Sequence, residues 1–328
     1  AIEFGAELKM LKSRINLDAT YYNSKTTDQI ISLNVPRSTG FFNKVVNAGS
    51  VQNKCVEITL GLVPVRTKDV SWMIDLNFSK NVQTVQLPPE IRSYNLQGGF
   101  SGLTIKAESG QSFGLYGTAW MRDSLGNIVI DANTGLRRTV ADRRLGNVYP
   151  DWMMGINNTV SYKNLSLSFL VDIREGGVMW SNTSSILRIN GLAKETAIDS
   201  DKIIIDPGVI LVDPVTNKYE PNTIPVQSMQ DYWSQFTSGN TEANVYNSSF
   251  VKLREVRLSY KVPSTVLSST KFIKGLEVGF EARNLWLIKS YVPHVDPEVN
   301  LFGSASLGEG VEFASVPSTR SFGVNLRV

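Results

Sequence analysis

One-for-one alternation of apolar and polar residues is the feature that most restricts the fold of this chain. At least nine segments show it, and the clearest is 272–286. There, one set of alternate positions is apolar and the other is polar or small: Leu276, Val278, Phe280 and Ala282 against Glu277, Gly279, Glu281 and Arg283. Successive side chains on a strand face opposite sides, so each segment needs one apolar and one wet surface. A soluble β-sandwich meets this need, and so does an outer-membrane barrel with lipid outside and a wet lumen inside.

The spacing of these segments separates the two architectures. Short turns join them in pairs, and excursions of tens of residues separate the pairs. The expected strands are 2–10, 14–22, 51–64, 70–82, 152–162, 165–174, 250–262, 272–286 and 320–328. Short turns at one rim and long loops at the other are typical of outer-membrane barrels, whose turns face the periplasm. The sequence therefore predicts an all-β, antiparallel transmembrane barrel with short periplasmic turns and long extracellular loops.

Local signals add detail inside the long excursions. Residues 112–122 and 128–130, split by a turn around Gly126, are expected to form a local hairpin. Ser228 and Asp231 resemble a capping box, which predicts a short helix that ends near Phe236.

Composition excludes several other classes. Hydrophobic residues make up 42% and charged residues 19% of the chain, yet no stretch approaches the ~20 apolar residues of a membrane helix. A net charge of +3 is too small to indicate a nucleic-acid partner. The single cysteine, Cys55, excludes internal disulfides and multi-cysteine metal sites, and the single histidine, His294, argues against histidine-based catalysis. We therefore expect no enzyme activity, no metal and no cofactor.

The number of strands predicts a larger assembly. Single-chain bacterial barrels have even strand numbers, and nine is odd. The chain also begins Ala-Ile-Glu-Phe, already in strand pattern and without an initiator methionine. We expect it to be the last part of a longer polypeptide.

Specific strings resemble the SusC/RagA family of TonB-dependent outer-membrane transporters. The stretch 47–57, Asn-Ala-Gly-Ser-Val-Gln-Asn-Lys-Cys-Val-Glu, resembles the family's NAGxxxNKGVE hairpin entry, with Cys55 at its usual glycine. Near the end, 250–256 (FVKLREV), 282–286 (ARNLW) and 317–323 (PSTRSFG) are similar to its C-terminal strands, although Val328 stands where an aromatic residue is customary. Residues 18–30 and 72–79 also match, so the resemblance spans the chain in the family's order.

The resemblance implies more than the alternation does. Members form 22-stranded barrels, so residues 1–328 would be a C-terminal section, and the plug domain and N-terminal barrel strands would lie outside this chain. Members import glycans or oligopeptides across the outer membrane of Gram-negative bacteria, chiefly Bacteroidetes. Expected partners are therefore a SusD-like surface lipoprotein, TonB through an absent N-terminal region, the remaining barrel and plug, membrane lipid, and an oligosaccharide or peptide substrate.

Aromatic side chains in the predicted extracellular loops are the candidate substrate-binding residues. They are Trp180, Tyr232, Trp233 and Tyr291. Aromatic faces suit sugars and peptide side chains, but the same residues could instead pack the loops together. A second aromatic set, on outward faces near strand ends, predicts an interfacial girdle: Tyr21, Trp72, Trp152, Tyr162 and Trp286.

Two groups of acidic residues could suggest a calcium site or acid–base catalysis, and the sequence favours neither. Asp199, Asp201 and Asp206 share a loop, but they lack the spacing and closing glutamate of an EF-hand. Glu277 and Glu281 share a strand face, where cross-strand pairing with arginine or lysine is the simpler expectation than acid–base catalysis.

Three functions remain open from the sequence. The first is the barrel section of an energy-dependent nutrient importer. The second is a passive porin or a structural barrel subunit of an outer-membrane assembly, and the third is a soluble all-β binding module. Loop aromatics serve glycans and peptides alike, so the sequence does not identify the substrate.

Overall fold

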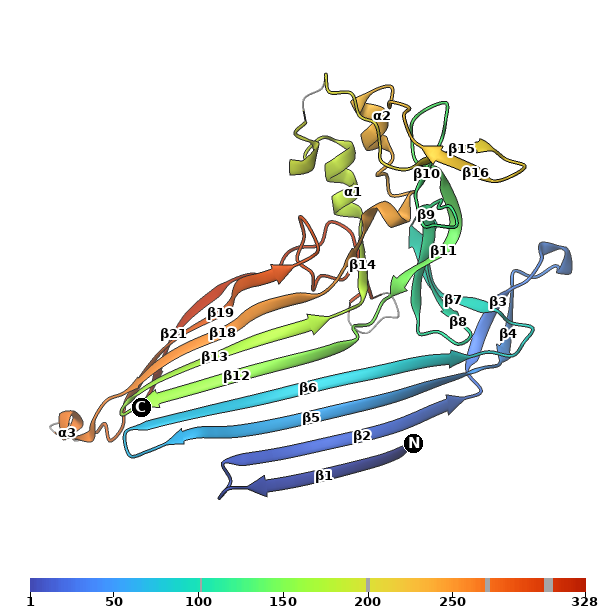
Figure 1. Ribbon diagram of the computed structural model, residues 1–328. Helices are drawn as coiled ribbons and strands as arrows, with labels where there is room; N and C mark the ends of the chain where they lie inside the picture. The colour runs from blue at the N-terminus through green and yellow to red at the C-terminus, as the bar shows by residue number, and fades with distance from the viewer. Residues whose placement is uncertain (101, 199–200, 269–271, 304–308) are drawn as a thin grey trace.

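The computed structural model describes residues 1–100, 102–198, 201–268, 272–303 and 309–328. Its main feature is a single antiparallel sheet of nine strands in that part of the chain, ordered β1-β2-β5-β6-β12-β13-β18-β19-β21 (Figure 1). The strands are β1 (Ile2–Met10), β2 (Ile15–Thr27), β5 (Ser50–Arg66), β6 (Val70–Gln86), β12 (Trp152–Tyr162), β13 (Leu165–Glu175), β18 (Phe250–Lys261), β19 (Glu277–Ser290) and β21 (Ser321–Arg327). All nine predicted segments are present and follow one another across the sheet, which confirms the predicted fold class.

The register of the sheet turns the alternation into continuous rows. One apolar row crosses eight strands through paired positions: Leu8, Leu17, Leu60, Leu76, Ile156, Val171, Leu253 and Trp286. A polar row on the opposite face runs through Ser71, Ser161, Ser166, Ser259, Gly279 and Asn325. Because a slip of one residue would exchange the two faces, the pairing fixes one apolar and one polar surface for the whole sheet.

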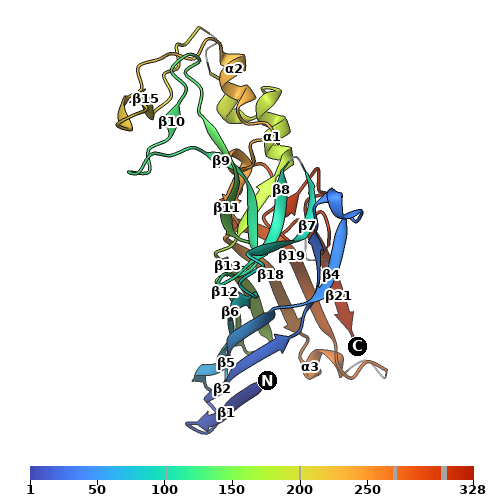
Figure 2. The same ribbon diagram turned by 90° about the vertical axis from the view of Figure 1, so that its right-hand side faces the viewer.

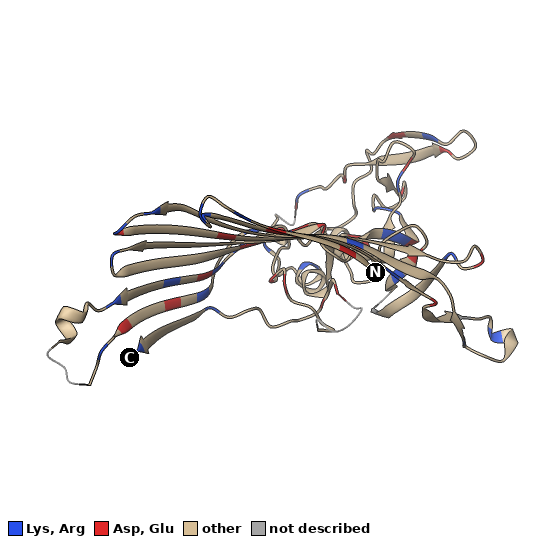
Figure 3. Ribbon diagram, turned by 90° about the horizontal axis from the view of Figure 1, so that it is seen from below, with Lys and Arg blue, Asp and Glu red and all other residues tan. Residues whose placement is uncertain are grey.

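The apolar face is left uncovered over much of its area. Phe4, Phe322 and Val324 are 68%, 63% and 74% exposed. Monomeric soluble proteins rarely expose contiguous apolar surface on this scale, whereas a barrel presents it to lipid. Viewed from below, the sheet is a single layer with charged residues spaced along its strands (Figure 3).

The predicted aromatic girdle lies on this face. Tyr21, Trp72, Tyr162 and Trp286 are all exposed, and Trp152 packs against Phe78 with ring centroids 6.0 Å apart. Their places near strand ends fit an interfacial role.

Charged pairs line the opposite face. Arg257 Nη2 of β18 lies 3.2 Å from Glu277 Oε1 of β19, which confirms the predicted cross-strand pairing for Glu277. Glu281 Oε1 instead lies 3.8 Å from Arg283 Nη2 of its own strand.

The two rims of the sheet differ as expected. Turns of a few residues join β1 to β2, β5 to β6 and β12 to β13, and the β18–β19 connection carries the short helix α3 (Ser264–Leu267). The long excursions leave from the other rim and stand above the sheet (Figures 1 and 2).

These excursions contain small sheets and short helices. The sheets in the described residues are β11-β9-β8-β7, β10-β15-β16, β17-β14-β20 and the hairpin β3-β4. Their strands are β3 (Ile30–Asn34), β4 (Asn43–Asn47), β7 (Ser93–Phe100), β8 (Leu103–Glu108), β9 (Gly114–Trp120), β10 (Val129–Ile130), β11 (Thr139–Asn147), β14 (Val178–Ser181), β15 (Val209–Asp213), β16 (Lys218–Pro221), β17 (Val245–Asn247) and β20 (Val311–Glu312). The helices are α1 (Asn182–Ile189) and α2 (Met229–Ser234), with 3-10 turns η1 (Arg37–Thr39), η2 (Lys194–Thr196) and η3 (Thr241–Asn244). None of the described helices combines the length and apolarity needed to cross a bilayer.

A hydrophobic core joins the loops to the rim of the large sheet. It contains buried side chains from β6, β8, β9, β14 and β20, together with Phe113 just before β9 and Val148 just after β11: Val85, Leu103, Ile105, Ala107, Phe113, Leu115, Val148, Trp180 and Val311. Strands that are far apart in the sequence therefore share one core, which holds the loop elements in place above the barrel wall.

Two local predictions need correction. The eighth strand begins at Glu277, not at 272, so Leu276 precedes it. The expected hairpin of 112–122 with 128–130 forms only next to its turn, where Arg122 and Ile128 make an antiparallel bridge and the Val129 N–H donates to the Met121 carbonyl at 2.8 Å. Beyond that point β9 pairs with β8 and β11, while β10 pairs with β15.

A charge on the apolar face tests which surface meets lipid. We expect Leu76→Arg in the full-length protein to lower the free energy of unfolding by about 2–4 kcal/mol, the range for a cation deep on a lipid face. Asn77→Arg, one residue along β6 on the polar face, is the matched control and should change stability much less. Urea titration of folded barrel, followed by heat-modifiable gel mobility, measures both variants. Equal losses would contradict the assignment of the faces.

Candidate functional site

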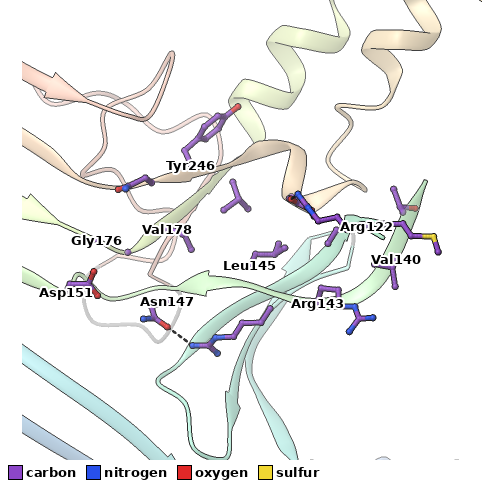
Figure 4. Close-up of a pocket in the computed structure, with 17 residues that line it drawn as sticks. Arg122, Val140, Arg143, Leu145, Asn147, Asp151, Gly176, Val178 and Tyr246 are labelled. Atoms are coloured by element: carbon purple, nitrogen blue, oxygen red, sulfur yellow. Dashed lines mark hydrogen bonds and ion pairs between the residues drawn. The ribbon is translucent and has the colours of Figure 1, made fainter. Parts of the chain in front are cut away.

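A cavity of about 960 Å³ lies between the β11-β9-β8-β7 sheet of the loops and the rim of the large sheet (Figure 4). Its size is in the range of small-ligand sites. The elements around it are β9, β11, β14, β17 and η3, with the ends of β12 and β13 below. Its lining residues are Ala119, Met121, Arg122, Thr139, Val140, Arg143, Arg144, Leu145, Asn147, Asp151, Gly176, Gly177, Val178, Glu242, Val245, Tyr246 and Asn247.

One side of the cavity is closed by a joint between β9 and η3. Thr241 packs on Gly117, where an added Cβ would lie 2.3 Å from Thr241 Oγ1. Glu242 accepts a hydrogen bond from the Trp120 backbone N–H at 2.6 Å and forms a two-point ion pair with Arg122. The Glu242 carboxylate therefore has partners on β9 and neutralises the charge of Arg122.

A second cavity, of about 850 Å³, lies against the polar face of the barrel wall. It shares Asn147 and Asp151 with the first cavity, so the two adjoin. Amide and hydroxyl side chains are prominent in its lining: Ser79, Asn81, Gln83, Thr84, Gln111 and Ser112. Such groups both donate and accept hydrogen bonds, which suits an uncharged polar ligand backbone.

A cluster of arginines and aromatic rings supports the upper loops. Arg137 lies over Trp120 and Phe236, at 5.0 and 5.8 Å from the ring centroids, and forms a bidentate ion pair with Asp206 at 2.6 and 2.8 Å. Arg188 lies over Phe236 from another side, at 5.2 Å. Three separate loop segments meet at one ring, so cation–π contacts help to fix their arrangement.

An ionic clasp, formed by Asp172, Lys252, Arg254, Asp296 and Glu298, anchors the last long loop to the barrel wall. Lys252 is 4% exposed and contacts Asp296 at 2.7 Å and also Glu298. Arg254 joins Glu298 to Asp172 of β13. Burial raises the pKa of Asp296 and of Glu298, but hydrogen bonds from Lys252, and from Ser318 or Arg254 respectively, outweigh it and leave each pKa below its ordinary value.

A second contact ties that loop to the excursion that carries α1 and α2. His294 Nε2 lies 3.2 Å from Glu195 Oε1, which also accepts a hydrogen bond from Arg188 Nε at 2.9 Å. Burial raises the pKa of Glu195, but its own backbone N–H and the hydrogen bonds from Arg188 and His294 lower the pKa to about 2. His294 is thus a loop residue that links two excursions.

Of the four predicted substrate-binding residues, only Tyr232 and Trp233 pack against each other. Trp180 is 0% exposed and belongs to the hydrophobic core, so its role in this arrangement is packing. Tyr232 and Trp233 lie half-buried on α2, where they pack against each other and against Phe236 at 5.1–5.7 Å between centroids. Tyr291 is 48% exposed, with Lys289 4.7 Å from its ring centroid. None of the four lines the 960 Å³ cavity, and their contact with substrate stays a prediction.

The capping prediction is confirmed. Ser228 Oγ accepts a hydrogen bond from the Asp231 N–H at 3.0 Å, and α2 begins at Met229, although it ends at Ser234, two residues early. Of the carboxylates considered as calcium ligands, Asp206 is paired with Arg137, and Asp199 lies outside the described residues. The described part of the chain holds no group of three or more residues placed to bind a metal.

The arginines of the cavity were missed by the sequence reasoning. The signal was the doublet Arg143-Arg144, which breaks the alternation of β11. Two adjacent arginines are typical of a solvent-exposed turn, and the sequence does not reveal that the strand around this pair is bulged.

The clasp predicts a pH response of the last loop. Asp296 and Glu298 have lowered pKa values when docked, so their contribution to docking is complete above the unfolded pKa of about 4 and declines below it, until pH has fallen through the docked pKa values. A nitroxide label at Val299→Cys should be immobile at pH 7 and mobile near pH 3 in electron paramagnetic resonance spectra. Lys252→Gln should mobilise the label already at pH 7. A label that stays immobile at pH 3 would contradict this account.

The buried Arg137–Asp206 pair predicts a local stability loss. Asp206→Asn leaves a buried guanidinium without its counter-charge, which costs about 3 kcal/mol or more. Hydrogen exchange of residues 203–226 should rise accordingly. Glu220→Gln, which breaks the exposed Lys218–Glu220 pair, is the matched control and should have little effect. Similar exchange in both variants would argue against the pair as the anchor of this loop.

Comparison with known proteins was made for the whole chain. No protein-family model matches it. TonB-dependent receptor P3 of Formosa agariphila is 24% identical over 360 residues, covering 100% of this chain and 33% of the receptor. TonB-dependent receptor SusC of Bacteroides thetaiotaomicron is 22% identical, covering 90% of this chain and 29% of SusC. The chain therefore spans about a third of the length of these curated relatives.

Solved structures agree with this placement. The structure of the RagAB peptide transporter matches with a TM-score of 0.69 and 20% identity, over 99% of this chain and 34% of that chain. RagAB in its open-open state gives the same TM-score. The match shows the fold, and the sequence relatives agree with the resemblance found in the strand motifs. The chain is therefore similar, over its whole length, to about one third of SusC/RagA-type TonB-dependent receptors, and its fold matches that part of the RagAB structures.

Proposed function

We propose that residues 1–328 form the C-terminal section of the barrel of a TonB-linked importer that takes up a glycan or oligopeptide nutrient. The observation that carries this proposal is that the nine-stranded sheet is open, with β1 and β21 at its two edges. Within the described residues, β1 pairs only with β2, and β21 pairs only with β19, so each edge of the sheet presents unpaired backbone groups. In lipid these groups need partners, and further strands of the same receptor supply them.

The location of the cavities supports import. They lie on the polar side of the sheet and at the rim that carries the long loops, where a ligand arriving from outside would first meet the protein. Binding and gating need no covalent chemistry, and the relatives are receptors and transporters. The force for transport would act on the plug through TonB, both outside this chain.

A SusD-like lipoprotein is the partner that the loops would meet. The match to the RagAB peptide transporter, over 99% of this chain, supports a partner of this kind. The name of the RagAB peptide transporter supports a peptide as one substrate class, and a glycan remains the other.

Energy coupling separates this proposal from a passive porin. Deleting the TonB-interacting segment of the full-length receptor in its native bacterium should abolish uptake of the nutrient that depends on the gene, while the barrel stays in the outer membrane. Growth on a panel of oligosaccharides and peptides, and uptake of the labelled nutrient, are the measurements. The receptor with an intact TonB segment is the control. Uptake that survives the deletion would support a porin or a structural subunit instead.

A further inference from the structure

Two neighbouring arginines in β11 both line the 960 Å³ cavity, which a regular strand does not allow. Successive side chains of a strand point to opposite faces. The pairing of β11 with β9 is irregular on both sides of the doublet, between Val140 and Arg143 and again between Arg144 and Gly146. These bulges explain why Arg143 and Arg144 reach the same cavity. Bulges that re-aim side chains are frequent beside functional sites.

The bulged backbone carries unusual conformations. Asp142 has φ 57°, in the left-handed region, and Gly146 has φ 155°. Asp142 is held by an ion pair with Lys106, so its carboxylate does not neutralise the arginines that follow it. A strained conformation costs free energy and persists where the surroundings hold it, which is common at ligand sites.

Arg144 is a half-buried cation whose hydrogen-bond acceptors are all uncharged. Its Nη1 donates to the Tyr116 hydroxyl at 3.1 Å, and its Nη2 donates to the Ser112 carbonyl at 3.1 Å, the Ser112 hydroxyl at 3.4 Å and the Asn147 side-chain carbonyl at 2.6 Å. The Tyr116 ring centroid is 5.6 Å from its guanidinium carbon. The Tyr116 hydroxyl in turn donates to the Glu108 carboxylate, so that carboxylate is one hydroxyl away from Arg144 and forms no direct ion pair with it. The contacts therefore fix the position of Arg144 without giving it a carboxylate partner among the described residues.

The other charges of the cavity do not cancel this excess. Arg122 is paired with Glu242. Arg143 is exposed and forms no ion pair with any described residue. The lining contains three arginines and two carboxylates. Arg122 and Glu242 neutralise each other, which leaves two positive charges and the single negative charge of Asp151 in the lining. Figure 4 shows Arg143 and Asp151 around the same cavity.

We propose that Arg143 and Arg144 bind a carboxylate group of the imported molecule, while the adjoining amide- and hydroxyl-rich cavity binds its uncharged polar part. This inference rests on the proposed import function and specifies its substrate as an acidic oligomer. A guanidinium matches a carboxylate in shape and can bind it through two hydrogen bonds. The carboxylate can come from an acidic peptide or from a uronic-acid oligosaccharide.

The test measures binding to the purified full-length receptor by isothermal titration calorimetry. One arm compares triglutamate with triglutamine, and the other compares trigalacturonate with its methyl ester. We expect the acidic member of one pair to bind at least tenfold more tightly than its neutral counterpart, and the arm that shows this identifies the source of the carboxylate. Equal binding within both pairs, or no binding of either acidic probe, would overturn the proposal.

Matched variants locate the effect. Arg143→Gln and Arg144→Gln should each weaken binding of the acidic probe by about 10- to 100-fold, the range for a hydrogen bond to a charged group, and should leave the neutral probe almost unchanged. Arg138→Gln removes the same charge from an exposed residue that does not line the cavity, so it is the control. An equal loss in Arg138→Gln would show a general charge effect and overturn the site.

Position can be separated from charge with Gly114→Ala. An added Cβ at Gly114 would lie 2.1 Å from Arg144 Nη1, so the guanidinium must move although both charges remain. We expect several-fold weaker binding of the acidic probe at unchanged folding, and unchanged binding would overturn the role of Arg144.

Energy-coupled uptake without a preference for acidic molecules would reject this inference alone, whereas uptake that is independent of TonB would reject the proposed function.

Discussion

Backbone pairing in register is the constraint on which the rest of this structure depends. Each of the nine strands alternates apolar and polar residues, but only the hydrogen-bonded register aligns them into the row from Leu8 to Trp286 and the row from Ser71 to Asn325. The same pairing gives the sheet one lipid-compatible face and one hydrated face. It also leaves β1 and β21 with open edges, because the described strands do not close on each other.

The loops are held by a different set of forces from those of the wall. A shared hydrophobic core that includes Trp180 joins them to the rim, and buried ion pairs fasten individual segments. Lys252 attaches the last loop to the wall, while Arg137 attaches the segment around Asp206 to the cluster at Phe236. The segments that line the cavity also lie far apart in the sequence, and the Arg122–Glu242 ion pair joins two of them.

Features set by neighbouring residues could be predicted from the sequence, whereas features set by distant partners could not. Strands were predictable because alternation is a local consequence of strand geometry, and the cap of α2 was predictable because Ser228 acts within one helical turn. The aromatic candidates were chosen by residue type, and type alone does not distinguish a core side chain such as Trp180 from an exposed one such as Tyr291. The hairpin assigned to 112–130 forms around its turn, at the Arg122–Ile128 bridge, but β9 finds its strand partners in β8 and β11, which the turn signal near Gly126 does not encode.

The sequence by itself determined the nine strands, the two unequal rims and the resemblance to a transporter family, since each depends on residues close together in the chain. Only the tertiary structure decided where the loops meet and which charges remain unbalanced. Arg143 and Arg144 are adjacent in sequence, yet both line one cavity because the pairing of β11 with β9 is bulged on either side of them. Charge balance likewise depends on partners far away in the chain, as Glu242 is for Arg122, and no local pattern of residues reveals such a partner.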